Sequence, residues 1–328
     1  MKTKQHILAL LENNRGQSIS GEQIAGKLGL SRNAVWKAIK ELRSDGYKIE
    51  AVTNKGYCLC ADNDILSVQG ILPFLKDKDV GENIMIFETL ESTNKTAKEL
   101  SISGAKHGTV VLARSQTAGR GRYARQFHSP PGGIYLSFIL HPDRLSLETP
   151  TLITAIAAVA VCRAVETVAT DSPRIKWVND IFSNGKKICG ILTEAVTDFE
   201  SGNIQWVVVG IGVNFNTKRQ DIPKDLRGII GSIFAEGNPI VTRNQLVGEI
   251  INQVLCGTTY GREQILCEYK KRLMMLGEQI TVVSKKETYR ATAMDIDGSG
   301  HLIVKKENDE ICTLSGGEIS IKGKTLSS

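Results

Sequence analysis

The most informative stretch of the sequence is QTAGRGRYAR, residues 116–125. Its glycines alternate with arginines, and each residue type contributes a separate property. A glycine lets the backbone adopt positive φ and approach a ligand closely, and an arginine guanidinium offers paired donors to a phosphate or a carboxylate. The stretch predicts a loop that holds an anionic ligand, although alone it is equally compatible with a flexible surface loop or an RNA-binding tract.

Further motifs lie on both sides of this loop. ESTN, residues 91–94, precedes a predicted helix, and KWVND, residues 176–180, is followed after an Asn-Gly turn by KKICGIL, residues 186–192. GIGVN, residues 210–214, ends a predicted buried strand. Taken singly, each motif is ordinary: a helix cap, a core tryptophan and tight glycine turns. The motifs become informative only when they are taken together, in their order along the chain.

Residues 1–63 predict a winged helix-turn-helix. Apolar side chains at helical spacing predict three helices, two of them capped by Ser20 and Ser31, and residues 47–59 predict a strand hairpin with a basic tip. The third helix would present a basic, hydrogen-bonding face to the major groove, and the hairpin would reach phosphate. The candidate DNA contacts are Ser31, Arg32, Asn33, Trp36, Lys37, Lys40 and Lys55. The alternatives are a winged helix that contacts only protein and, for Trp36, a place in the core.

Composition and charge limit the class of protein. The chain has 328 residues and a net charge of +6, and ten Lys and Arg against six Asp and Glu place a net +4 in residues 1–63. A small basic unit indicates an anionic partner. The longest apolar stretch, residues 152–162, is shorter than the roughly 20 residues of a membrane span. Because the N-terminus also lacks the pattern of a secretory signal, we expect a cytoplasmic protein.

The cysteines point to neither disulfides nor zinc. The chain has 7 cysteines, an odd number, and they contain no Cys-x-x-Cys pair. A disulfide framework or a zinc ribbon is therefore not indicated, and we expect most of these thiols to be reduced and buried.

Residues 64–273 predict a catalytic domain of mixed α and β structure. The predicted strands cover residues 84–87, 109–113, 134–140, 188–194 and 206–213. The predicted helices cover residues 94–100, 151–168 and 245–271. Residues 274–328 contain closely spaced short strands, which indicate a small β-barrel. These strands are predicted over residues 279–283, 289–294, 301–304 and 311–314.

In this order the motifs resemble the biotin protein ligases, and the likeness extends over nearly the whole chain. The two terminal domains match the bifunctional members, which also repress biotin-biosynthesis operons. The resemblance implies an α+β fold, with a central domain related to class II aminoacyl-tRNA synthetases and an SH3-like C-terminal domain. It implies a reaction in which biotin and Mg-bound ATP form biotinoyl-5'-AMP, after which biotin passes to a lysine of a carboxyl-carrier protein. Operator DNA is the further partner, with the adenylate as corepressor and a homodimer as the adenylate-bound form.

The resemblance also assigns site residues. The expected biotin-binding residues are Ser92, Thr93, Asn94, Gln116, Arg120, Gly121, Arg122 and Lys187. The expected catalytic residues are Lys187, Arg122, Arg120 and Asp180. The expected nucleotide-binding residues are Gly119, Phe127, Asn179, Asn214 and Lys322. Lys187 is expected nearest the biotin carboxylate and the α-phosphate, its alternative being a solvated turn lysine, and no protein-held metal site is expected.

Three positions depart from the family pattern. Ala124 replaces a glycine, Val178 replaces a proline that often precedes Asn-Asp, and Phe127 replaces a tryptophan. If position 124 needs positive φ, alanine costs on the order of 1 kcal/mol there. These changes concern loop closure and leave the charged groups in place.

Two other functions stay open at this point. One is a ligand-sensing DNA-binding regulator without ligase activity, which the retained Lys187 and loop arginines disfavour. The other is a ligase of the same chemistry that takes lipoate or octanoate. Gln116 and the Gly-Arg-Gly-Arg loop favour biotin.

Overall fold

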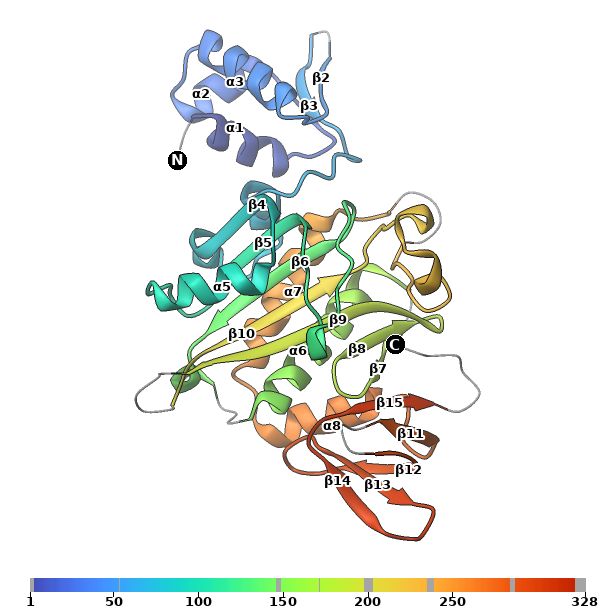
Figure 1. Ribbon diagram of the computed structural model, residues 1–328. Coiled ribbons are helices and arrows are strands. Elements are labelled where there is room, and N and C mark those ends of the chain that lie inside the picture. The colour runs from blue at the N-terminus through green and yellow to red at the C-terminus, as the bar shows by residue number, and fades with distance from the viewer. Residues whose placement is uncertain are drawn as a thin grey trace. The chain divides into compact units, whose positions relative to one another are not determined.

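The computed structural model describes residues 3–52, 54–145, 149–170, 172–197, 203–234, 239–283 and 287–321. The chain forms two compact units, one of Met1–Glu82 with Ile240–Glu249 and the other of Asn83–Pro239 with Ile250–Ser328. The elements are labelled in Figure 1. Each unit is described by itself.

The first unit is built around three helices and a small sheet. Its elements are α1 (Thr3–Glu12), β1 (Ser18–Ile19), α2 (Gly21–Leu28), α3 (Arg32–Ser44), β2 (Ile49–Val52), β3 (Gly56–Leu59), α4 (Val68–Ile71) and the start of α7 (Arg243–Gly257). The strands pair in the order β1-β3-β2. The predicted caps are confirmed, because Ser20 forms a capping box with Gln23 and the Ser31 side chain accepts from the Ala34 amide.

The third helix is amphipathic as predicted. Val35, Ile39 and Leu42 are buried in a core with α1 and α2. Trp36 is 52% exposed, so it belongs to the polar face and not to the core.

The strand β1 was not predicted, since two residues are too few to show an alternating pattern.

The second unit contains a seven-stranded sheet in the order β4-β5-β6-β10-β9-β8-β7. Its strands are β4 (Ile84–Leu90), β5 (Thr109–Gln116), β6 (Ile134–Leu140), β7 (Arg174–Lys176), β8 (Asp180–Ser183), β9 (Lys186–Thr197) and β10 (Ile204–Val213). The β4–β5 pair is parallel and the other pairs are antiparallel. All five predicted strands are present, and β7 and β8 are additional.

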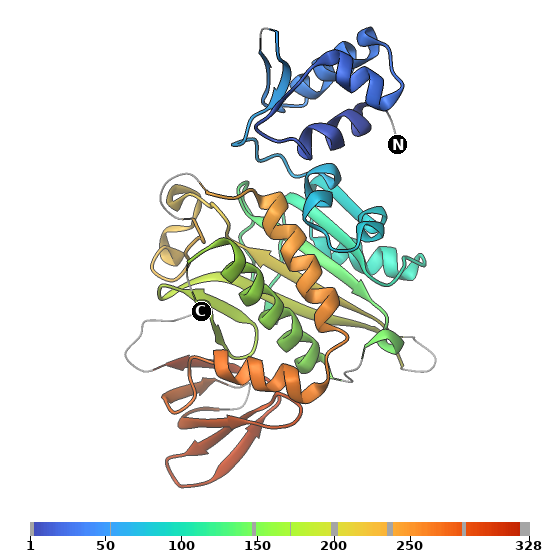
Figure 2. The ribbon, with the colours of Figure 1, turned by 180° about the vertical axis from the view of Figure 1, so that it is seen from behind.

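Helices cover this sheet. α5 (Thr93–Ile102) packs on β5, β6 and β10. α6 (Pro150–Val168) packs on β8, β9 and β10, and Figure 2 shows it across the rear face of the sheet. α6 has the length and hydrophobicity of a membrane-spanning helix, but 78% of its most apolar window is buried within the structure, as in a core helix. The apolar stretch 152–162 is thus the middle of this 19-residue helix.

One predicted helix is wrong. Residues 245–271 form two helices, α7 and α8 (Arg262–Arg272), because the chain turns between Gly257 and Gly261. At Gly257 a Cβ atom would lie 2.7 Å from Ile156 Cγ2, so a glycine is needed for the close approach to α6.

The chain after Gly277 forms a five-stranded antiparallel sheet in the order β14-β13-β12-β11-β15. Its strands are β11 (Gln279–Val283), β12 (Thr288–Ile296), β13 (Leu302–Lys306), β14 (Ile311–Leu314) and β15 (Glu318–Ile321). The four predicted strands are present, and β15 pairs with β11 in addition.

The expectation that most cysteines are buried is wrong. All seven thiols are free, but only Cys162 and Cys189 are buried, and Cys267 is exposed. Both buried thiols lie in the core of the second unit, on α6 and β9.

Candidate active site

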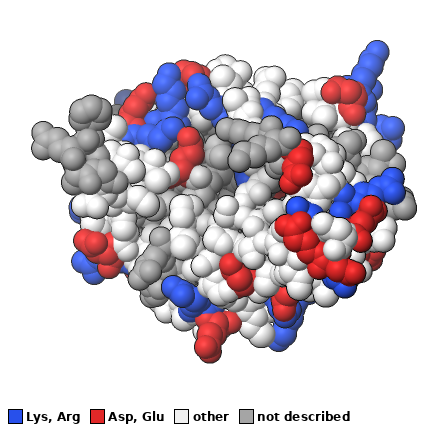
Figure 3. All heavy atoms as spheres, turned by 60° about the horizontal axis from the view of Figure 1, so that its bottom comes forward, with Lys and Arg blue, Asp and Glu red and all other residues white. Residues whose placement is uncertain are grey.

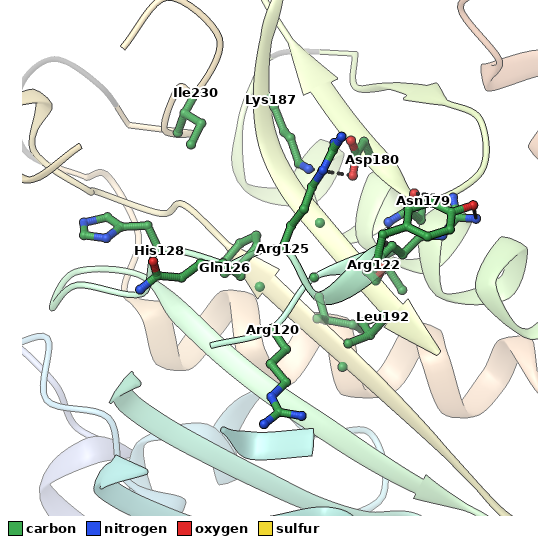
Figure 4. A pocket seen from close by; sticks show the side chains of 18 of the residues that line it. Arg120, Arg122, Arg125, Gln126, His128, Asn179, Asp180, Lys187, Leu192 and Ile230 are labelled. Atoms are coloured by element: carbon green, nitrogen blue, oxygen red, sulfur yellow. Dashed lines mark hydrogen bonds and ion pairs between the residues drawn. The ribbon is translucent and has the colours of Figure 1, made fainter. Parts of the chain in front are cut away.

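A cavity of about 290 Å³ lies in the second unit, beside β9 and β10. All five of the quoted sequence motifs line it, together with Gly317 and the first two residues of β15. A cavity of this size that combines apolar walls with a few polar groups is the usual form of a small-molecule site. Figure 4 shows several of the lining side chains from close by.

Glycines form the floor of the cavity. Gly190 on β9 and Gly212 on β10 are register partners. A Cβ atom on Gly212 would lie 2.4 Å from the Phe127 ring, and one on Gly210 would lie 2.1 Å from Asn94 Oδ1. The missing side chains therefore let an aromatic ring and an amide lie directly on the sheet.

The polar end of the cavity is built from Thr93, Asn94 and Gln116. The Thr93 amide donates to Gln116 Oε1 at 2.7 Å, and Ser137 Oγ lies 2.8 Å from Thr93 Oγ1 and 2.7 Å from Asn94 Oδ1. Asn94 Nδ2 donates to Glu194 Oε2 at 2.7 Å. Although burial acts to raise it, hydrogen bonds from Lys98 and Asn94 hold the pKa of Glu194 below its usual value.

Ser92 begins α5 as its N-cap residue, but its side chain makes no capping bond. The side chain is buried and lines the cavity with Thr93 and Asn94. The predicted ESTN and Gln116 residues are therefore brought together at one end of the cavity.

The cationic end contains two lysines and one carboxylate. Lys187 Nζ lies 2.7 Å from Asp180 Oδ1, and the Lys187 side chain is 23% exposed. Lys176 is the register partner of Asp180 across β7 and β8, so both side chains lie on one face of the sheet. Burial lowers the pKa of Lys176, the Asp180 charge opposes this shift, and the Lys187 charge adds to it.

The arginine-rich loop closes on itself between β5 and β6. Gly121 donates to the Arg125 carbonyl at 2.8 Å, and Phe127 donates to the Gly119 carbonyl at 2.8 Å. Tyr123 and Ala124 have φ values of 55° and 59°, so position 124 does require positive φ. Alanine in this conformation therefore carries a steric cost of about 1 kcal/mol, as expected from the sequence if position 124 needs positive φ.

The three loop arginines point in different directions (Figure 4). Arg122 Nη1 lies 3.4 Å from Asn179 Oδ1 and from the Gly317 carbonyl. Arg120 points away from the Lys187–Asp180 pair, and its nearest acid is Glu91 at 4.0 Å. Arg125 Nη2 donates to Glu318 Oε2 at 2.6 Å.

Three of the candidate nucleotide-binding residues, Phe127, Asn179 and Asn214, line the cavity, and Gly119 does not. Phe127 covers the glycine floor, and Asn214 Nδ2 donates to the Lys187 carbonyl at 3.4 Å. Asn179 Nδ2 donates to the Ile191 carbonyl at 2.8 Å, and Gly119 begins the loop. Lys322 lies outside the described residues.

Sequence reasoning missed several residues of this cavity. Lys176 and Arg125 belong to motifs that were quoted, and their charge was a usable signal. Leu226, Ile229 and Ile230 come from a segment without a motif, and the Lys187 amide donates to the Ile229 carbonyl at 2.8 Å. Only the fold brings this segment to β9.

Within the described ranges, no three His, Cys, Asp or Glu side chains gather at one point. A Mg²⁺ ion that enters with ATP would be held mainly by phosphate oxygens.

In the first unit, the candidate DNA contacts are all exposed, on α3, at its N-cap and on the hairpin. Lys40 Nζ lies 5.5 Å from the centroid of the Trp36 ring, and Arg32 pairs with Glu22 at 2.7 Å. Lys55 is exposed at the hairpin tip. By contrast, basic and acidic side chains are interspersed on the face drawn in Figure 3.

Comparison with known proteins gives three family matches. Residues 86–214 match the biotin/lipoate A/B protein ligase family, residues 3–58 match an HTH domain, and residues 275–322 match the biotin protein ligase C-terminal domain. Among solved structures, the biotin protein ligase of Aquifex aeolicus, in complex with biotin and ATP, has a TM-score of 0.63 at 22% identity, covering 74% of this chain and 99% of that one.

Curated relatives align over almost the full chain. The bifunctional ligase/repressor BirA of Bacillus subtilis is 37% identical over 92% of this chain and 94% of that protein. BirA of Escherichia coli is 28% identical over 96% of each chain. The chain therefore belongs to the biotin/lipoate A/B protein ligase family, and within it to the bifunctional ligase/repressors.

Proposed function

We propose that this protein activates biotin with ATP, transfers it to a lysine of a carboxyl-carrier protein and represses transcription of biotin genes. In the first step a biotin carboxylate oxygen attacks the α-phosphorus, and the bond to pyrophosphate breaks. In the second step a lysine amine attacks the acyl carbon of biotinoyl-5'-AMP, AMP leaves, and the amine loses a proton. The observation that carries this proposal is one cavity with a polar end at Thr93, Asn94 and Gln116 and a cationic end at Lys187.

The first step joins two anions, so the site has to offset charge repulsion. Fixed charges do this best in a pocket that excludes water. Lys187 supplies the central cation, with Arg122 beside Asn179 and the exposed Arg120 also lining the cavity. Mg²⁺ bound to ATP would shield the phosphate oxygens.

The polar end suits the ureido ring of biotin. Amide and hydroxyl groups pair with a ring that both donates and accepts hydrogen bonds. Ser92, Thr93, Asn94 and Gln116 supply such groups within a buried region. A lipoate ring offers no such partners and would leave these groups unpaired, which disfavours the lipoate alternative.

The remaining site residues have proposed roles around the nucleotide. Phe127 would move from the glycine floor to stack on adenine, with Gly119, Asn179, Asn214 and Lys322 around the nucleotide. Gly121 would let the loop approach the ligand. Asp180, held by Lys187, would orient the incoming lysine amine or accept its proton.

The first unit would bind operator DNA through α3 and the hairpin. The adenylate would act as corepressor by favouring a homodimer that presents two winged helices to two half-sites. We also propose that the central domain is related to class II aminoacyl-tRNA synthetases, that the C-terminal sheet is SH3-like and that the protein acts in the cytoplasm.

The decisive test mixes the full chain with biotin, ATP, Mg²⁺ and a carboxyl-carrier domain. We expect the carrier to gain one biotinoyl group at its acceptor lysine, as measured by mass spectrometry. If the carrier stays unmodified while the protein still binds biotin, the result would favour the alternative function, a DNA-binding regulator without ligase activity. Addition of lipoate with equal efficiency would favour the lipoate ligase instead.

A further inference from the structure

Ser129 is hydrogen-bonded to two residues that line the cavity, Gln116 and Phe127. It follows the arginine-rich loop and is only 5% exposed. Its hydroxyl contacts the Gln116 side chain on one side and the Phe127 backbone on the other. The Ser129 carbonyl accepts from the Gln116 backbone N–H at 3.2 Å, so the two segments lie side by side.

The hydrogen bonds through Ser129 have only one consistent direction. The Thr93 amide can only donate, so the atom of Gln116 at 2.7 Å from it must be the carbonyl oxygen Oε1. Gln116 Nε2 then donates to Ser129 Oγ at 2.8 Å, and the Ser129 hydroxyl donates to the Phe127 carbonyl at 3.0 Å. If the Gln116 amide turned over, two N–H groups would face each other at Thr93.

The packing around Gly119 holds this arrangement in place. A Cβ atom on Gly119 would lie 2.5 Å from the Phe127 carbonyl oxygen, 2.6 Å from Ser129 Oγ and 2.9 Å from Gln116 Nε2. The three groups therefore converge on Gly119, a loop position that has no side chain. Phe127 also donates to the Gly119 carbonyl at 2.8 Å, so the loop and the hydroxyl are tied together.

We propose that Ser129 is a positioning residue that joins the biotin end of the site to the nucleotide end. It sets the orientation of the Gln116 amide, whose second N–H is left for a ligand in the cavity, and it ties that amide to the backbone of Phe127. This inference rests on the proposed function, in which Gln116 contacts biotin and Phe127 contacts the nucleotide.

The inference predicts a thermodynamic coupling. Biotin that binds Gln116 in its ordered orientation also stabilises the Ser129 hydroxyl and the Phe127 carbonyl that follows it. A nucleotide that binds against Phe127 then meets a backbone that is already ordered. Each ligand should raise the affinity of the other by the same factor, because coupling free energies are reciprocal.

The experiment uses isothermal titration of the full chain with biotin and with α,β-methylene-ATP, which cannot release pyrophosphate. The main variant is Ser129→Ala. The matched control is Ser101→Ala, which also removes a buried hydroxyl, 1% exposed, whose bond goes to the Lys98 carbonyl away from Gln116. Nucleotide affinity is measured with and without saturating biotin.

We expect Ser129→Ala to weaken biotin binding about tenfold, because Gln116 Nε2 loses its partner and the amide can turn over. The factor by which biotin raises nucleotide affinity should fall toward 1. Ser101→Ala should leave both quantities unchanged, and Ser129→Thr, which keeps the hydroxyl, should restore the coupling. A kinetic assay should show a raised KM for biotin with kcat changed much less.

The inference is overturned if Ser129→Ala keeps the wild-type biotin affinity and coupling factor. It is also overturned if Ser129→Thr and Ser129→Ala behave alike while both remain folded. If Ser129→Ala does not fold, Gly119→Ala decides the matter, since its methyl group enters the same three-way contact and should reduce the coupling. If the wild-type protein does not bind biotin at all, the proposed function itself fails, and that result is distinct from retained binding without coupling.

Discussion

Replacing Lys187 is the most informative perturbation of the site. Its ammonium lies in a partly closed cavity, 2.7 Å from Asp180 and 23% exposed. A unit charge about 4 Å from a phosphate oxygen contributes about 4 kcal/mol at an effective dielectric constant near 20. If most of that attraction grows only in the transition state, Lys187→Ala should slow adenylate formation about 10²- to 10³-fold.

Neighbouring residues supply the controls. Lys186 precedes Lys187 on β9 and interacts with the Gly228 carbonyl, so Lys186→Ala removes the same charge outside the Asp180 pair. Lys187→Ala also removes the ammonium that pairs with the Asp180 carboxylate, which is 13% exposed, and should lower Tm even though Lys176 remains opposite it. The double variant Lys187→Ala, Asp180→Asn should recover Tm without recovering the rate.

The assay is pyrophosphate release in a single turnover, with biotin affinity measured separately by titration. We expect a large loss of rate for Lys187→Ala and less than about a tenfold change in the Kd for biotin. Pyrophosphate release close to wild type, or an equal loss in Lys186→Ala, would refute the catalytic role of Lys187.

The other predictions concern DNA, pH and the loop. Lys37→Ala should weaken binding to all operator sequences alike and reduce by about 1 the slope of log affinity against log salt concentration. The control Lys27→Ala should leave DNA binding unchanged, and neither variant should change the ligase rate. A gel-shift salt series checks this. Burial raises the pKa of the Cys162 thiol to about 12, above its ordinary 9.0, so its contribution to stability is complete below pH 9 and is lost as pH rises through about 12. Between about pH 8 and about pH 11, the free energy of urea unfolding should fall by about 2.7 kcal/mol less in Cys162→Ala than in the wild type, and equal losses would contradict this. Glu318→Ala should lower the KM for ATP a few-fold, because it removes an anion and releases Arg125, with a change in stability below about 1 kcal/mol; a raised KM would contradict it.

Much of the fold could be predicted because the relevant signals are local. The caps at Ser20 and Ser31 and the apolar positions of α3 follow from helical spacing alone. The break between α7 and α8 was missed, although Gly257 and Gly261 flank it; that position 257 needs a glycine depends on a long-range contact with Ile156 on α6. The strand β15 depends likewise on its long-range pairing with β11.

The same distinction between local sequence signals and long-range contacts holds for the residues of the site. Motif residues such as Asn94 and Lys187 were predicted from the resemblance to the biotin protein ligases that the order of the motifs carries, and the fold brings them to one cavity. The position of Phe127 on the floor depends on contacts across three segments of the chain. The ion pair of Arg125 with Glu318 joins residues 193 positions apart, and sequence spacing holds no information about it.

The central claim is that one shielded cavity lets biotin and ATP react despite their charges. The most direct measurement incubates the purified full chain with both substrates and Mg²⁺ and detects the acyl adenylate by mass spectrometry. We predict one equivalent of biotinoyl-5'-AMP bound per chain and one equivalent of pyrophosphate released. Folded protein that binds both substrates yet forms neither product would contradict the claim.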